Sequence, residues 1–289
     1  MRRHPAKARL VGGAVITLVL IGVASCRGEL AALGANGLLH PSRRVVDIAP
    51  PSDYKSVSFV GGDVTLAGWL VTARTLPWRA TIIYLHGVAD SRGSSIPVIE
   101  RFVNRGFDVV AYDSRAHGDS SGDACTYGFY EKRDLSRVVD ELGSGPVVVI
   151  GSSLGAAVAL QAAAEDSRIT AVVAAESFAD LRTVATERAP WFFDRGVVSR
   201  AFVIAEGLGS FRVDAVSPAA AARRIKAPVF VIHGTDDVET SAEHSRRIFA
   251  ALGGERRLRL VAGAGHNRSL TPAVWLEIES WIDSVLGKR

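Results

Sequence analysis

Three residue types that together perform acyl transfer occur in a fixed order along this sequence. Ser153 is the central residue of GSSLG (residues 151–155), which fits the pattern G-x-S-x-G. Asp237 follows the apolar run VFVIHG, and His266 lies in VAGAGHN. A serine hydroxyl becomes a strong nucleophile when a histidine accepts its proton and a carboxylate orients that histidine. The sequence therefore predicts a triad of Ser153, Asp237 and His266.

Two of these residues have an immediate neighbour of the same type. Ser152 precedes Ser153, but successive side chains of a strand point to opposite faces, so we assign Ser152 no chemistry. Asp236 precedes Asp237, and it competes with Asp237 when spacing alone is considered. We choose Asp237 as the acid.

The predicted nucleophile lies where a buried strand gives way to a helix. A β-branched run ends at Gly151, and an alanine-rich helix is expected from Leu154. Such a turn lifts the serine hydroxyl off the sheet, and the flanking glycines let neighbouring elements approach closely. The first N–H groups of the helix then point toward a developing oxyanion.

Apolar runs alternate with helical patterns over most of the chain. Continuous apolar runs are typical of strands buried on both faces of a parallel sheet, and here they are TIIYLHG, FDVVAYD, VVVIG, ITAVVAAE, VFVIHG and LRLVAGAG. Helical patterns occur at about 94–105, 129–142, from 154 and at 273–286, and a β-hairpin is expected at 54–73. This alternation predicts an α/β fold, with a mostly parallel central sheet and helices on both faces.

One long connection interrupts the alternation. About fifty residues separate AAES from IKAPVF, which is more than a single crossover helix requires. We expect a small cap within about residues 180–215, over the ends of the strands. Its cluster Trp191-Phe192-Phe193 either lines an acyl pocket or packs the cap against the body.

The N-terminus has the pattern of a membrane-directed segment. A cationic start, MRRHPAKAR, precedes an apolar run of about sixteen residues that ends before Cys26. This length lies between a signal-peptide core and a spanning helix. Residues 23–26 (VASC) resemble the lipobox of bacterial lipoproteins, so the segment is either a lipoprotein signal or an uncleaved anchor; a buried soluble helix is the third alternative. The preceding charges predict a cytoplasmic N-terminus and an extracytoplasmic body.

These patterns predict three regions: a membrane anchor or lipoprotein signal at residues 1–26, a connector at 27–53 and a catalytic domain at 54–289. The net charge of +4 also divides between them. Residues 1–44 hold seven basic residues and one acidic residue, and the remaining 27 basic and 29 acidic residues give the rest a charge of −2. A basic body would favour nucleic acid, and this body is not basic.

The cysteine content excludes a structural zinc site. Cys26 and Cys125 are the only two cysteines, and no paired-histidine helix spacing occurs. With Cys26 in or on a membrane, Cys125 has no partner within the chain, and we expect its role to be structural or incidental.

The quoted motifs resemble the α/β-hydrolase superfamily, especially membrane-anchored members with a serine-aminopeptidase-like domain. The order serine, aspartate, histidine is the order of that fold. The resemblance extends over nearly everything after about Leu38 and includes LLHPSR, GGDVTLAGWLV, YLHGVADSRGS, YDSRAHGDSSG and GAGHN. In YDSRAHGDSSG, Ala116 replaces a usual glycine.

The resemblance implies roles for further residues. The backbone N–H groups of Val88 and Leu154 would form the oxyanion hole. Asp113, Arg115 and His117 would be structural, and an acid three residues after the glycine of HGTDD would again be Asp237.

The expected activity is hydrolysis of a carboxylic ester or thioester through an acyl-enzyme, with no metal or organic cofactor. Membrane tethering and an apolar cap favour a small-molecule acyl ester or lipid-like substrate. A membrane-tethered serine peptidase or aminopeptidase is the alternative, although no acidic cluster for a substrate amino terminus is identifiable in the cap sequence. A non-catalytic binding module would be expected to have a broken triad, and this triad is complete.

Overall fold

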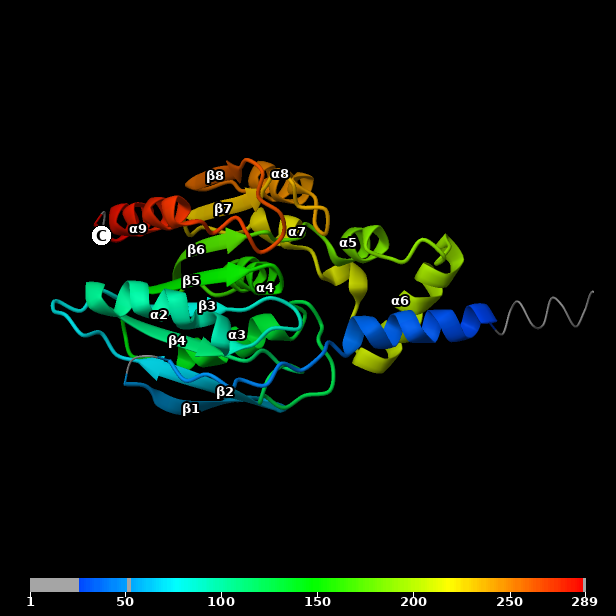
Figure 1. Ribbon diagram of the computed structural model, residues 1–289, viewed down its shortest axis with the longest axis horizontal. Helices are drawn as coiled ribbons and strands as arrows, with labels where there is room; N and C mark the ends of the chain where they lie inside the picture. Colours follow the sequence, from blue (N-terminus) through cyan, green and yellow to red (C-terminus); the bar gives the residue numbers. More distant parts are fainter. Residues whose placement is uncertain (1–25, 51–52, 288–289) are drawn as a thin grey trace, which may run out of the picture.

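One eight-stranded sheet organises the described part of the chain, which comprises residues 26–50 and 53–287 of this computed structural model (Figure 1). Its order is β1-β2-β4-β3-β5-β6-β7-β8. β2 pairs antiparallel with β1 and β4, and the other pairs are parallel, as predicted. The strands are β1 (Lys55–Gly61), β2 (Val64–Val71), β3 (Ala80–Leu85), β4 (Phe107–Tyr112), β5 (Val147–Ser152), β6 (Ile169–Ala175), β7 (Val229–Gly234) and β8 (Arg256–Val261).

Helices cover both faces of the sheet. Side chains of α3, α4, α7 and α8 share one apolar cluster with one set of strand residues, and those of α2 and α9 share another with the opposite set. The α-helices are α2 (Ile96–Phe102), α3 (Glu131–Asp140), α4 (Leu154–Ala163), α5 (Leu181–Glu187), α6 (Arg195–Gly209), α7 (Pro218–Ala222), α8 (Ala242–Ala251) and α9 (Pro272–Gly287). The 3-10 helices are η1 (Arg92–Ser95), η2 (Val103–Arg105) and η3 (Val213–Ala215).

The central strand β5 illustrates why the apolar runs are continuous. Val149 packs in the cluster with α3 and α4, whereas Val148 and Ile150 pack in the cluster with α2 and α9. Every residue of β5 is buried. A strand covered on both faces has no solvent side, so its sequence shows no alternation of polar residues.

The long connection between β6 and β7 contains α5, α6, η3 and α7. In Figure 1, α5 and α6 lie at the end of the molecule opposite the C-terminus, beside the N-terminal helix drawn in blue. The range expected to form the cap thus holds α5, α6 and η3.

Within the segment expected as a connector, residues 26–39 are helical. Ala31, Ala35 and Leu39 of this helix are fully buried, and their spacing by four residues places them on one face. An added Cβ at Gly34 would lie 2.8 Å from the ring of Phe193, so the glycine allows the helix to approach the cap closely. The expectation of a plain connector did not include this packing.

Hydrogen bonds fix the end of this helix to the loop before α3. The Tyr127 hydroxyl donates to the carbonyl of Leu38 at 3.0 Å, and the Cys125 N–H donates to the carbonyl of Leu39 at 2.8 Å. Arg43 donates to the carbonyl of Gly122 at 2.6 Å. The segment that follows the predicted anchor is therefore bonded to the domain that contains the sheet.

The predicted anchor itself, apart from Cys26, lies outside the described residues. In the ranges that the structure does describe, no helix combines the length and the apolar character needed to cross a bilayer. Cys26 is exposed and Cys125 is buried.

Candidate active site

Ser153 lies in a strained turn between β5 and α4. Its φ of 50° and ψ of −110° are unusual for a residue with a side chain, and such strain costs on the order of 1–3 kcal/mol. A Cβ added at Gly151 would lie 2.4 Å from backbone atoms of Gly155. A Cβ added at Gly155 would lie 2.2 Å from the Leu85 carbonyl oxygen. Both glycines are therefore required for the strand and helix to pack this closely.

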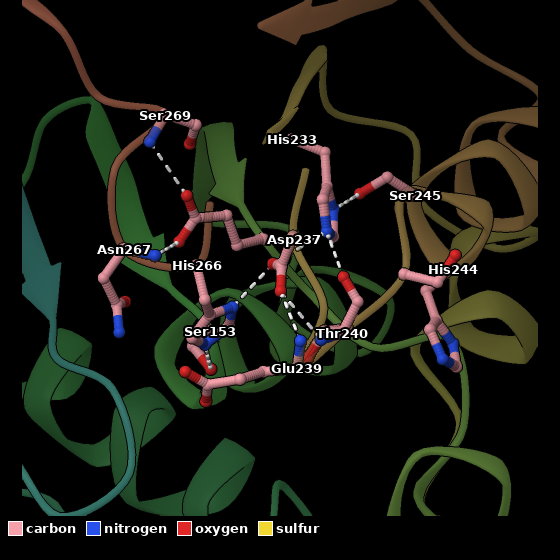
Figure 2. A network of polar contacts seen from close by, with 12 residues as sticks. Ser153, His233, Asp237, Glu239, Thr240, His244, Ser245, His266, Asn267 and Ser269 are labelled. Atoms are coloured by element: carbon pink, nitrogen blue, oxygen red, sulfur yellow. Dashed lines mark hydrogen bonds and ion pairs between the residues drawn. The ribbon is translucent and has the colours of Figure 1, made fainter. Parts of the chain in front are cut away.

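The structure brings the three predicted residues together, and Figure 2 shows the His266 ring between Ser153 and Asp237. The His266 Nε2 lies 3.1 Å from the Ser153 Oγ, and its Nδ1 lies 2.6 Å from the Asp237 Oδ2. Because the ionised carboxylate only accepts hydrogen bonds, Nδ1 carries the proton and Nε2 is free to accept one. This is the tautomer that a general base requires.

Asp237 is held in its ionised form by four donors. Its Oδ1 accepts from the N–H groups of Glu239 at 3.0 Å and Thr240 at 2.8 Å. Its Oδ2 faces both His266 and the Nε2 of His233, the latter at 3.2 Å. Burial acts to raise the pKa of Asp237, but the hydrogen bonds from His233, His266 and Thr240 outweigh it and hold that pKa well below its usual value.

His233 is a buried part of the site that sequence reasoning did not assign. Its Nε2 carries a proton that is shared between the Thr240 carbonyl oxygen at 2.7 Å and the Asp237 Oδ2 at 3.2 Å, and its Nδ1 lies 2.6 Å from the Ser245 hydroxyl. The spacing of four residues between His233 and Asp237, after a buried strand, is the signal that would have found it.

Asp236 and Ser152 lie outside the hydrogen-bonded chain of the triad. The Asp236 carboxylate accepts from the Thr235 hydroxyl at 2.8 Å and has no contact with His266 among the described hydrogen bonds. The Ser152 hydroxyl lies 3.4 Å from the Oδ1 of Asn267. The hydrogen bonds thus distinguish Ser153 from Ser152 and Asp237 from Asp236.

A second carboxylate, that of Glu176, holds the loop that carries His266. It accepts from the N–H groups of Asn267, of Arg268 at 3.2 Å and of Ser269 at 3.0 Å. Glu176 is buried and has a φ of 57° directly after β6. Sequence reasoning missed it, and the only signal was a single acidic residue after an apolar run.

The loop after β3 places Val88 beside Ser153. His86 Nε2 accepts from the Ser114 N–H at 3.0 Å, so its Nδ1 carries a proton and donates to the Gly87 carbonyl at 2.7 Å. In a trans peptide the N–H points away from the carbonyl, so the Val88 N–H points away from His86. Val88 and Leu154 line the same cavity as Ser153, and α4 begins at Leu154 with N–H groups that lack helical partners.

The buried rings of His86 and His117 pack edge to face, with their centroids 5.1 Å apart. His117 Nδ1 donates to the Arg115 carbonyl at 2.9 Å. Burial, with a contribution from His86, lowers the pKa of His117 from 6.5 to about 4. Ala116 has a φ of 61°, a left-handed conformation that favours glycine, which accounts for the glycine that the family resemblance leads one to expect there.

This pair predicts a loss of stability in mild acid. The unfolded chain takes up a proton at His117 below about pH 6.5, and the fold resists it until about pH 4, so stability present at pH 7 is lost as pH falls through this window. The change amounts to at most about 3 kcal/mol. Urea unfolding at pH 7 and pH 4.5 measures it, and His117→Asn, which retains a donor, should lose less stability than the wild type. His40→Asn, at an exposed histidine, is the control and should lose as much stability as the wild type. An equal loss of stability in His117→Asn and the wild type would contradict the assignment.

A cavity of 440 Å³ adjoins Ser153. Val88 and Leu154 line it together with side chains of α5, α6 and the helix at residues 26–39. Elsewhere, the described residues contain no cluster of histidine, cysteine and acidic side chains arranged to hold a metal ion.

The aromatic cluster of the cap contacts the cavity and the N-terminal helix. Phe192 and Phe193 line the cavity, and Phe193 also packs against Gly34. Trp191 is 95 % exposed and does neither.

Comparisons with known proteins agree with this architecture. The sequence pattern of the family described as "alpha/beta hydrolase fold" matches residues 80–207. The uncharacterized protein YqkD of Bacillus subtilis is 31% identical over 201 residues, which are 66% of this chain and 66% of YqkD, just under two thirds. The uncharacterized protein YfhR of Escherichia coli is 26% identical over 87% of this chain and 86% of its own. The structure of the esterase Pf2001 of Pyrococcus furiosus has a TM-score of 0.69 at 28% identity, covering 86% of this chain and 98% of that one.

Proposed function

From the alpha/beta hydrolase fold that this chain has, we propose that it is a serine hydrolase that cleaves carboxylic esters or thioesters through an acyl-enzyme. The observation that carries the proposal is the hydrogen-bonded path from Ser153 through His266 to Asp237. The similar structure of Pf2001, whose title names an esterase, supports the same class of reaction.

The geometry supports a defined sequence of steps. His266 Nε2 accepts the Ser153 proton as Oγ attacks the carbonyl carbon of the substrate, and Asp237 stabilises the imidazolium that forms. The N–H groups of Val88 and Leu154 bind the resulting oxyanion, and each such donor is worth about 3–4 kcal/mol. The tetrahedral adduct collapses when His266 protonates the leaving alcohol or thiol, and water then attacks the acyl-enzyme with His266 again as base.

The walls of the cavity favour an ester over the free amino terminus of a peptide. Among the described residues that line it, none is aspartate or glutamate. An aminopeptidase must balance the charge of a substrate ammonium group, and an uncompensated buried charge is strongly unfavourable.

The proposal includes a membrane tether at residues 1–26, with the catalytic body outside the cytoplasm. Its support is the cationic start, the apolar run and the sequence VASC that ends at Cys26. The mass of the mature protein distinguishes a lipidated chain that begins at Cys26 from an intact anchor.

A substrate panel tests the proposed reaction. We expect the full chain to hydrolyse a p-nitrophenyl ester and an acyl thioester with a kcat/KM at least a hundredfold above that for an aminoacyl-4-nitroanilide. Ser153→Ala is the control for contaminating hydrolases. A preference for the aminoacyl amide would instead establish the peptidase alternative.

A further inference from the structure

We propose that the helix at residues 26–39 is one wall of the substrate site, and that the cavity beside it takes a single linear acyl chain of about a dozen carbons. This inference rests on the proposed function, because it assigns the acyl part of the substrate to the cavity and the reacting carbonyl to Ser153. It goes beyond that function by making an N-terminal helix, far from the triad in sequence, a determinant of chain length.

The cavity extends from the reacting group into the cap. Ser153, Val88 and Leu154 lie along it on the body side. Leu181 and Val184 of α5, Val198 and Phe202 of α6, and Leu33 and Leu38 of the N-terminal helix line the remainder. An apolar cavity that begins at a nucleophile suits a substrate whose apolar chain is attached directly to the carbonyl.

The polar side chains along the cavity are bonded to other groups of the protein, and only that of Ser153 is bonded to a catalytic base. The Tyr127 hydroxyl donates to the Leu38 carbonyl at 3.0 Å. Arg188 donates from Nε to the Glu239 carbonyl at 2.7 Å and from Nη2 to the Thr240 hydroxyl at 2.6 Å. The Ser153 hydroxyl, bonded only to the base that activates it, is left for the substrate. A ligand here is therefore apolar along its length and reactive at one end.

The size of the cavity sets the length of the chain. Its volume of 440 Å³ lies within the range of small-molecule sites. A methylene group occupies about the same volume as a water molecule, roughly 30 Å³, so complete filling of 440 Å³ corresponds to about fifteen carbons. A linear chain does not fill an irregular cavity completely, which leaves room for about a dozen carbons. Each methylene that leaves water for an apolar site improves binding by roughly threefold to fourfold.

The wall formed by the N-terminal helix is fixed to the rest of the protein. Its buried face packs on the cap, and an ion pair joins Arg27 to Asp194 at the start of α6. At its other end, Leu38 and Leu39 accept hydrogen bonds from the loop that carries Cys125 and Tyr127. Contacts with the cap and with the loop before α3 thus hold this wall at both of its ends.

Two glycines of this helix provide a matched pair of variants. Gly37 lines the cavity, and an added Cβ there meets no atom within 4 Å. Gly28 has the same free space but does not line the cavity. Phenylalanine at either position removes a helical glycine, which favours the helix, but only Gly37→Phe places a ring at the cavity.

The test measures kcat/KM for p-nitrophenyl esters from acetate to palmitate, with each full-length protein in the same lipid nanodiscs. We expect the wild type to prefer chains of about ten to twelve carbons over acetate by at least tenfold. Gly37→Phe should lower the ratio of dodecanoate to acetate activity by at least tenfold, and Gly28→Phe should retain the wild-type ratio. A wild type that prefers acetate, or equal profiles for the two variants, would overturn the inference.

A binding measurement separates this inference from the proposed chemistry. Calorimetric titration of Ser153→Ala with dodecanoate below its micelle concentration requires no catalysis. We expect saturable binding that Gly37→Phe, introduced into the same background, weakens at least tenfold while Gly28→Phe does not. Binding with this pattern in a protein that hydrolyses no ester would support the cavity and refute the proposed reaction, whereas ester hydrolysis without dodecanoate binding would do the reverse.

Discussion

Ser153→Ala is expected to abolish covalent labelling by a fluorophosphonate probe and to lower kcat for ester hydrolysis by about 10⁴- to 10⁶-fold. His266 contacts the Ser153 hydroxyl at 3.1 Å. In the variant, a water molecule that takes the place of this hydroxyl could not form an acyl-enzyme. Alanine tolerates the same backbone strain no worse than serine, so the variant should fold, which a thermal melt verifies.

Ser152→Ala is the matched control for this prediction. Its hydroxyl faces Asn267 at 3.4 Å and lies outside the triad, so labelling and kcat should stay within a few-fold of the wild type. Equal labelling of the wild type and Ser153→Ala would overturn the assignment of the nucleophile. Loss of labelling only in Ser152→Ala would transfer that role to Ser152.

Asp237→Asn should have the second largest effect, a fall in kcat of about 10⁴-fold. The carboxylate accepts the proton-bearing Nδ1 of His266 at 2.6 Å. An amide that turns its NH₂ toward this ring would favour the opposite tautomer, in which Nε2 carries the proton and no longer accepts that of Ser153. Stopped-flow kinetics with an activated ester would measure the residual rate.

Asp236→Asn supplies the comparison. Its carboxylate accepts from the Thr235 hydroxyl, so we expect a change of only a few-fold in kcat. If the two variants lost activity equally, the loop as a whole would be required and the specific role of Asp237 would be unsupported. If Asp236→Asn alone were inactive, the acid would have been assigned to the wrong residue.

Features encoded by local patterns were predictable from the sequence. The strands that carry the site are continuous apolar runs, and the ends of parallel strands lie at one edge of a sheet, so Ser153, Asp237 and His266 were expected to meet. The strand-to-helix change around residues 151–155 places the serine without any knowledge of its distant partners. The mostly parallel sheet and its helices followed from the same periodicity.

Features that depend on backbone partners were not predictable. Glu176 holds the histidine loop through N–H groups of Asn267, Arg268 and Ser269, and every residue except proline carries such a group. No residue type in that loop therefore identifies its partner. His233 is a different case, because its spacing of four residues from Asp237 after a buried strand is a signal in the sequence, whereas the contact itself depends on the folded turn after β7.

The helix at residues 26–39 escaped prediction for a different reason. Its buried face consists largely of alanine, and Gly34 provides contact by having no side chain. Such small residues give a weak amphipathic pattern, and glycine has low helix propensity. The packing partner, the cap, makes this face an interior surface, and that partner lies more than 150 residues away in the chain.

Because this helix lies between the proposed membrane tether and the body, proteolytic release of the body would also alter the proposed substrate site. Residues 43–45 just beyond it are exposed, as a protease site would be. A cut there, followed by separation of the helix from the cap, would leave the helix with the proposed membrane tether and release a body that retains Ser153, Asp237 and His266. The released body would have lost the wall formed by Leu33 and Leu38, and its apolar cavity would open to water. Under the proposed tether and the proposed substrate site, one segment would link cellular location to substrate selectivity, and a shed enzyme would differ from the tethered one in what it cleaves as well as in where it acts.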